Sequence, residues 1–133
     1  MAIVSGCALT QQYVRFPDQS KTVEDVSKAR IYVARPSVVG GAIPMTVSDG
    51  DTVIGSTGPK GYLCWERDPG SMEVKGKCEN TCLLAVQVEQ GKVYHIKQSP
   101  TMGFLIARNK LELVSAEEGQ EIIDKCKPPK LVE

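Results

Sequence analysis

The chain has 133 residues, of which 41% are hydrophobic and 24% are charged; this favours a single globular domain and argues against a disordered chain. Lys plus Arg number 16 and Asp plus Glu number 16, so the net charge is zero and no nucleic-acid partner is expected. No apolar run approaches the ~20 residues that a membrane-spanning helix needs.

The beginning of the chain carries Val-Ser-Gly-Cys at residues 4–7. This motif resembles a bacterial lipobox, in which small residues admit a signal peptidase that cuts before the cysteine, and Cys7 then receives lipid. The six residues before Cys7 are too few for a signal peptide. We therefore interpret residues 1–7 as the remnant of a lipoprotein signal, either trimmed or begun at a misassigned start. A chance match is the alternative interpretation.

Residues 8–27 are polar and show no clear hydrophobic period. We interpret them as a tether with some local packing through Tyr13, Val14 and Phe16. A coil of this length spans about 25 Å on average, which suits a domain held just off a membrane surface.

A β-rich domain is predicted over residues 28–127. In the first strand, Ile31 and Val33 share one face, while Arg30, Tyr32 and Ala34 share the other. Turns are predicted at Asp49-Gly50 and at Asp68-Pro69-Gly70, where glycine tolerates positive φ and proline fixes φ. The predicted strands are residues 30–35, 43–48, 52–54, 62–67, 71–77, 81–89, 93–97, 104–107 and 111–114.

One helix is predicted at about residues 115–126. Ser115 and Glu118 form a capping box, and Pro128 and Pro129 end the helix before a tail at residues 128–133. The fold class is therefore mainly β: an antiparallel β-sandwich or partly rolled sheet of about seven to nine short strands with one C-terminal helix.

Four cysteines remain once Cys7 is set aside, and in an oxidising compartment they would form disulfides. Three pairings are possible. A Cys78–Cys82 bond would close a tight loop, and Cys64–Cys126 would then be the second bond. A zinc site that includes His95 is the alternative, but only one spacing suits a zinc knuckle, so no metal is predicted. Reduced thiols in a cytosolic protein are a third interpretation.

Several sequence blocks, taken in order, carry a family likeness. Ala-Arg-Ile-Tyr-Val-Ala-Arg-Pro at residues 29–36 is similar to the opening strand of a bacterial family of uncharacterised lipoprotein domains, domain of unknown function 2846. The later blocks that follow the order of that family are residues 47–50 with Gly55, 61–63, 68–70, 91–94, 102–104 and 111–114. The likeness covers about residues 29–125.

The resemblance implies an envelope lipoprotein with a small β-rich domain and supplies no established catalytic residues. The four cysteines beyond Cys7 depart from the family pattern. Ala8 follows Cys7, and the absence of aspartate there is similar to lipoproteins sorted to the outer membrane in Gram-negative cells. The expected location is thus the periplasmic face of the envelope, with the lipid on Cys7 in the membrane.

Four residues are candidate ligand-binding groups. Arg30 and Arg35 flank Tyr32, so planar donors and an aromatic face could together hold an anion or a sugar. Trp65 could stack on a carbohydrate. The alternative is that Trp65 belongs to the core and that the arginines are solvated.

No nucleophile elbow, P-loop or dinucleotide fingerprint is present in the sequence. His95 lies in a predicted strand without a motif around it, so no catalytic residue and no cofactor are expected. The leading hypothesis is a non-enzymatic, lipid-anchored envelope domain that binds another envelope protein. The alternatives are a glycan- or peptidoglycan-binding module, a small hydrolase-like enzyme, and a cytosolic protein with reduced thiols.

Overall fold

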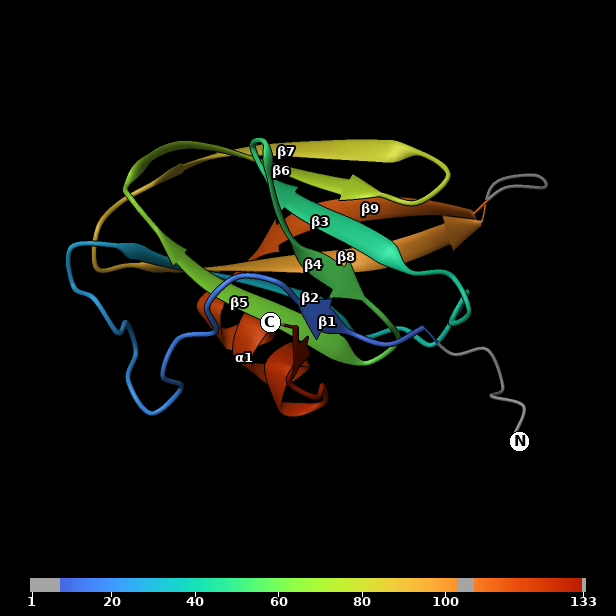
Figure 1. Cartoon of the computed structure of the whole chain (residues 1–133), viewed down its shortest axis with the longest axis horizontal. Coiled ribbons are helices and arrows are strands. Elements are labelled where there is room, and N and C mark those ends of the chain that lie inside the picture. Colours follow the sequence, from blue (N-terminus) through green and yellow to red (C-terminus); the bar gives the residue numbers. More distant parts are fainter. Residues whose placement is uncertain (1–7, 103–106, 133) are drawn as a thin grey trace.

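Two β-sheets pack face to face in the computed structural model, which describes residues 8–102 and 107–132 (Figure 1). In these residues the strand order is β10-β1-β4-β3-β6-β7 in the larger sheet and β5-β2-β8-β9 in the smaller. Most neighbouring strands are antiparallel, whereas β1–β10 and β2–β8 are parallel. The prediction of a mainly β sandwich with a C-terminal helix is confirmed.

The ten strands of the described residues divide between the two sheets. The larger sheet contains β1 (Gln11–Gln12), β3 (Met45–Asp49), β4 (Thr52–Thr57), β6 (Gly70–Lys77), β7 (Thr81–Val88) and β10 (Lys130–Leu131). The smaller sheet contains β2 (Ala29–Arg35), β5 (Gly61–Arg67), β8 (Val93–Met102) and β9 (Ala107–Val114). The strand predicted at 111–114 is confirmed but begins earlier than predicted, because β9 covers residues 107–114. The strand predicted at 104–107 shares only Ala107 with the described residues. Residues 104–106 lie outside the described part.

The main core lies between the two sheets. Ile31 and Val33 of β2 point into it, as their alternation predicts, and meet Val47 of β3 and Val74 of β6. Burial of these side chains is the main favourable contribution to folding, at about 25 cal/mol per Å² of apolar surface.

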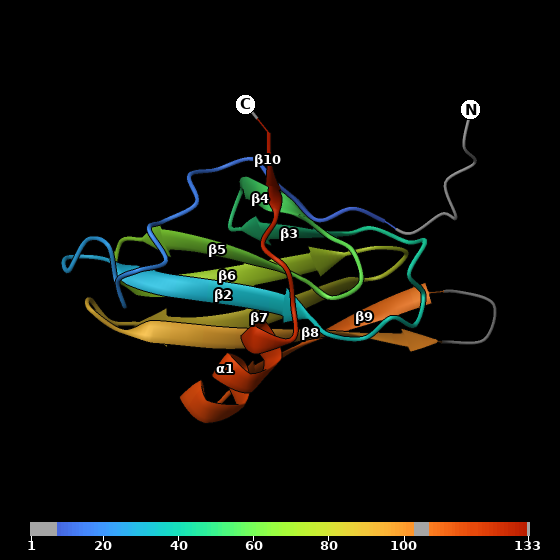
Figure 2. The same ribbon diagram turned by 90° about the horizontal axis from the view of Figure 1, so that it is seen from below.

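A second apolar cluster lies on the outer face of the smaller sheet, where Tyr62 and Cys64 are covered by Ile122 and Ile123 of the helix α1 (Ala116–Asp124). Figure 2 shows this helix beneath the sandwich, on the side of the smaller sheet. Ser115 is its N-cap, and its side-chain oxygen accepts a hydrogen bond from the Glu118 N–H at 3.1 Å. That bond is the first half of the predicted capping box.

Residues 8–27 are not a tether, and residues 130–131 of the predicted tail form a short strand. Gln11–Gln12 pairs with β4 on one side and with Lys130–Leu131 on the other. The backbone of the incoming segment crosses close over glycines: a Cβ on Gly58 would overlap the Ala8 carbonyl, and one on Gly55 would overlap that of Gln11. The tether prediction is wrong because backbone pairing, which needs no apolar pattern, anchors this polar segment. The local packing expected of Val14 and Phe16 is present, since Val14 packs on the main core and Phe16 on the second apolar cluster.

Candidate functional site

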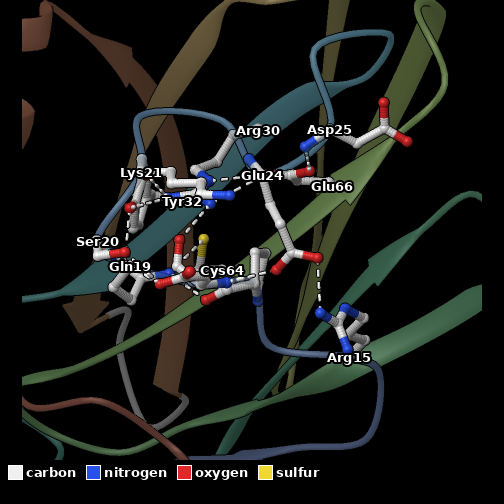
Figure 3. Close-up of polar contacts among 12 residues, drawn as sticks. Arg15, Gln19, Ser20, Lys21, Glu24, Asp25, Arg30, Tyr32, Cys64 and Glu66 are labelled. Atoms are coloured by element: carbon white, nitrogen blue, oxygen red, sulfur yellow. Dashed lines mark hydrogen bonds and ion pairs between the residues drawn. The ribbon is translucent and has the colours of Figure 1, made fainter.

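Arg30 is saturated by hydrogen bonds and is not open to a ligand (Figure 3). Its side chain is 1% exposed, and Nε and Nη2 each lie 3.0 Å from Glu66 Oε2. Nη1 donates to the Lys21 carbonyl and to the Tyr32 hydroxyl, and Nη2 also donates to the Asp18 carbonyl. Four hydrogen bonds and the ion pair with Glu66 thus engage all three guanidinium nitrogens. Arg30 holds the segment around residues 18–21 against the smaller sheet.

Glu66 completes this cluster from the neighbouring strand. Besides its ion pair with Arg30, its carboxylate accepts hydrogen bonds from the backbone N–H groups of Glu24 at 2.7 Å and of Asp25 at 3.0 Å. One buried ion pair therefore satisfies the backbone of a segment that has no secondary structure of its own.

Tyr32 is also engaged within the protein. Its hydroxyl donates to Gln19 Oε1 at 2.8 Å, and its ring stacks on the His95 ring with centroids 5.0 Å apart and planes 4° apart. Burial raises the pKa of Tyr32 to about 12. Its ring is packed against a neighbouring side chain, so it does not provide the free stacking face expected for a sugar site.

Arg35 lies on the other face of the same strand and cannot act together with Arg30 and Tyr32. It is fully buried and donates to the carbonyls of Gly40, Ile43 and Thr57 at 2.7–2.9 Å. Burial lowers the pKa of its guanidinium. The predicted Arg30/Tyr32/Arg35 site is thus wrong as a joint ligand face, because odd and even residues of a strand face opposite sides.

Trp65 is part of the core and also borders a cleft. The residue is 3% exposed, and its Nε1 donates to Asp49 Oδ2 at 2.9 Å. Beside it is a surface cleft of about 660 Å³ between the 14–28 segment and the ends of β4 and β5. Each lysine or arginine that lines the cleft is paired with a carboxylate: Arg15 with Glu24, Lys28 with Asp68, and Arg67 with Asp49. The cleft therefore suits a neutral polar ligand better than an anion.

His95 and Cys64 do not form a catalytic pair. Both lie directly opposite Tyr32, on the two strands that flank β2, so the Tyr32 ring separates them by two strand spacings, about 10 Å. Burial lowers the pKa of His95, whose Nδ1 has no hydrogen-bond partner among the residues that the structure describes. Burial raises the pKa of Cys64 to about 11, which keeps this thiol protonated at neutral pH and a poor nucleophile.

The two predicted disulfides are not present in this structure. Cys64, Cys82 and Cys126 have free thiols. In the β6–β7 hairpin, Cys78 Sγ donates to Asn80 Oδ1 at 3.3 Å, and Cys82 Sγ accepts from the Leu111 N–H at 3.4 Å, so the two sulfurs are directed to different partners. Residues 8–102 and 107–132 contain no group of three metal-ligating side chains, and Cys7, the lipidation candidate, lies outside them.

The edges of the sheets differ in how they are protected. The outer edge of β5 is covered by the Gln12 side chain, whose Nε2 donates to the Cys64 carbonyl at 2.7 Å and whose Oε1 accepts from the Cys64 N–H at 3.0 Å. The Tyr62 N–H of the same edge donates to the Lys127 carbonyl at 3.2 Å. The Gln12 amide thus takes the place of a neighbouring strand.

The remaining long edge strands of the described residues are β9 and β7, which lie next to each other. The Leu111 N–H of β9 donates to Cys82 Sγ of β7 at 3.4 Å, and the Asn109 N–H donates to Asn80 Oδ1, in the turn before β7, at 2.7 Å. β9 carries Arg108, Lys110 and Glu112, whose charges oppose pairing with another chain. β7, Thr-Cys-Leu-Leu-Ala-Val-Gln-Val, carries no charge in eight residues, and Leu83 on it is 54% exposed. No described segment lies beyond β7 in the larger sheet (Figure 1). The run of uncharged residues is visible in the sequence, but only the strand order shows that it forms an edge.

The chain is similar to an uncharacterised protein of Haemophilus influenzae, with 29% identity over 96 residues. The aligned part covers 71% of this chain and 57% of that relative, so the chain spans little more than half its length. No family model and no solved structure matches the chain, and the family resemblance of residues 29–125 stays a prediction. In the described residues, no helix has the length and apolar character needed to cross a membrane.

Proposed function

We propose that this chain is a non-enzymatic, lipid-anchored domain of the bacterial cell envelope that binds another envelope protein. The lipobox-like residues 4–7, the ordered blocks shared with uncharacterised lipoprotein domains and the similarity to a bacterial protein support this proposal. The lipid on Cys7 holds the domain at the periplasmic face, on the outer membrane where the cell has one.

The observation that carries the binding function is the uncharged edge of β7. Proteins usually protect an edge strand with charges, prolines or a covering segment, as β9 and β5 are protected here. An extended segment of a partner protein can add to such an edge through backbone hydrogen bonds, while exposed side chains such as Leu83 supply specificity. β7 therefore serves as the docking strand.

The test is capture of partners from detergent-solubilised envelope by the immobilised 133-residue chain, with heat-unfolded chain as the background. The captured protein is then purified, and its affinity is measured against Leu83→Lys and the matched variant Leu113→Lys, which changes an exposed leucine on β9. We expect Leu83→Lys to weaken binding by about tenfold or more, equivalent to about 1.4 kcal/mol, and Leu113→Lys to leave it unchanged. Equal affinities for both variants would contradict docking at β7.

The anchor is tested separately in cells that produce the natural protein. Cys7→Ser should move it from the membrane fraction to the soluble fraction, because the acyl chains supply the membrane affinity. A variant that still sediments with membranes would show that lipidation of Cys7 is not the anchor.

A second candidate function is glycan or peptidoglycan binding in the cleft beside Trp65. The cleft volume and the pairing of its lysines and arginines with carboxylates favour such a neutral polar ligand. Trp65→Ala is a poor test because this residue belongs to the core, where its loss costs about 3–5 kcal/mol. Thr52→Arg instead fills the cleft from an exposed position. Loss of binding to purified cell wall on this change, with an unaltered unfolding midpoint, would favour the glycan function.

A further inference from the structure

Three exposed apolar side chains gather at the end of the sandwich where the described chain begins. Leu9 is 65% exposed, and Val38 and Val39, in the connection between β2 and β3, are 62% and 52% exposed. The Ala8 N–H donates to the Gly41 carbonyl at 2.6 Å, which joins the two segments. Figure 1 shows the start of the chain beside this connection. The three side chains thus belong to one end of the molecule.

This surface lies next to the proposed lipid attachment point. Cys7 directly precedes Ala8, and consecutive Cα atoms are about 3.8 Å apart. Ala8 is itself fixed to the domain, by its bond to Gly41 and by its close passage over Gly58. No flexible spacer therefore separates the acyl chains from the folded domain, and the bilayer must lie within reach of Leu9, Val38 and Val39.

The charges on the segments next to these three side chains suit a membrane surface. The turn at residues 58–60 lies alongside the β2–β3 connection, since a Cβ on Gly41 would be 3.4 Å from Pro59 Cγ. This turn presents the exposed Lys60. Residues 8–12, 36–44 and 58–62 contain no Asp or Glu and one lysine. Apolar side chains next to a lysine, without carboxylates, are typical of surfaces that lie at the boundary between lipid headgroups and acyl chains.

We infer that Leu9, Val38 and Val39 form a membrane-contacting surface through which the domain lies directly on the phospholipid bilayer. This inference rests on the lipid anchor of the proposed function. The apolar side chains enter the boundary between headgroups and acyl chains, and Lys60 lies at the level of the phosphates. The acyl chains and this surface then fix the orientation of the domain as well as its location. The end of the sandwich that holds the 18–28 segment points away from the bilayer (Figure 1).

A tryptophan introduced at one surface position reports this contact. Val39→Trp places the probe on the proposed surface, and Val26→Trp, at a 78% exposed valine in the 18–28 segment, is the matched control. The native Trp65 is buried and contributes the same background to both variants. Each lipidated protein is purified from membranes, checked for acyl chains by intact mass, and reconstituted into phosphatidylethanolamine–phosphatidylglycerol vesicles that contain brominated lipid.

We expect the Val39→Trp emission to shift to the blue and to be quenched by the brominated chains, and the Val26→Trp emission to match that of soluble protein. Equal, negligible quenching in the two lipidated variants would overturn the membrane surface while leaving the lipid anchor intact. If the mass shows no acyl chain, the anchor fails, and the same comparison is made on the unlipidated chain with excess vesicles. Selective quenching at residue 39 would then still support the surface, and its absence would overturn it.

Discussion

Gly119 of α1 lies directly on the imidazole ring of His95 in β8. It is the buried residue of the helix, and a methyl group at this position would overlap the ring. The imidazole also stacks on the Tyr32 ring, with ring centroids 5.0 Å apart. The contacts from Gly119 to His95 and from His95 to Tyr32 therefore connect the helix, β8 and β2. Because residue 119 has no side chain, the helix backbone can approach the sheet closely.

Replacement of Gly119 by alanine should destabilise the protein. In an exposed helix this change stabilises by about 0.5–1 kcal/mol, because alanine restricts the unfolded chain and favours the helix. Here the overlap with His95 should outweigh that gain and lower the free energy of unfolding by about 1–3 kcal/mol. Urea unfolding measures the change, with Gln120→Ala on the exposed face as the control. A stabilised Gly119→Ala variant would show that the helix does not pack on His95.

Stability should fall as the pH is lowered through the ordinary pKa of histidine. Burial holds the pKa of His95 in the folded protein below 6.5, so the unfolded chain binds more protons than the folded chain between these two values. The stabilising contribution is complete above pH 6.5 and is lost toward the folded pKa, with a slope of at most about 1.4 kcal/mol per pH unit.

The pH dependence can be assigned because the chain has one histidine. Urea midpoints are compared between pH 5.5 and 7 for the wild type and for His95→Gln. The burial of the ring predicts a slope that disappears in the variant. A slope of equal size in both proteins would assign the effect to other groups.

The alternating strands could be predicted because local pattern and tertiary packing agree there. Ile31 and Val33 face the core because every second residue of β2 points inward, and this period is visible without a structure. The capping residue Ser115 was predicted for the same reason, since its hydrogen bond to Glu118 spans three residues. Short-range interactions of this kind depend on few neighbours.

The fixed N-terminal segment and the closed ligand site could not be predicted, because they depend on contacts distant in sequence. The Gln12 side chain bonds to Cys64, 52 positions away in the sequence. The Arg30 guanidinium donates to the carbonyls of Asp18 and Lys21 and forms an ion pair with Glu66. An arginine looks equally available in a sequence whether its donors are free or saturated. The same holds for β7, whose exposed edge is defined by the order of strands.

Removal of the negative charge at Glu66 should be severely destabilising. Glu66→Gln keeps the size of the side chain but leaves the Arg30 guanidinium buried beside a neutral group. Breaking one side of a buried ion pair costs about 3–5 kcal/mol. The exposed pair Lys92–Glu89 supplies the control, since Glu89→Gln should leave the urea midpoint unchanged. Equal midpoints for the two variants would contradict the structural role of the Arg30–Glu66 pair.

The Cys64 thiol should resist alkylation in the folded protein. Burial raises its pKa to about 11, and the thiolate is the reactive species, so iodoacetamide at pH 8 has little to attack. Peptide mass spectrometry before and after urea unfolding should show Cys64 modified only in the unfolded chain, with the half-buried Cys126 as the internal comparison. Rapid modification of Cys64 in the native protein would contradict its burial.

Truncation of Gln12 should both destabilise the protein and open a sheet edge. Gln12→Ala removes the amide that pairs with the backbone of Cys64, and an unpaired buried N–H or carbonyl costs about 1–3 kcal/mol. The newly exposed edge of β5 can then pair with another chain, so the variant should also self-associate at high concentration. Urea unfolding and sedimentation velocity measure the two effects, with the partly exposed neighbour Gln11→Ala as the control. If both variants keep the stability of the wild type and stay monomeric, the Gln12 amide is dispensable. The backbone of the neighbouring segments then protects the edge of β5.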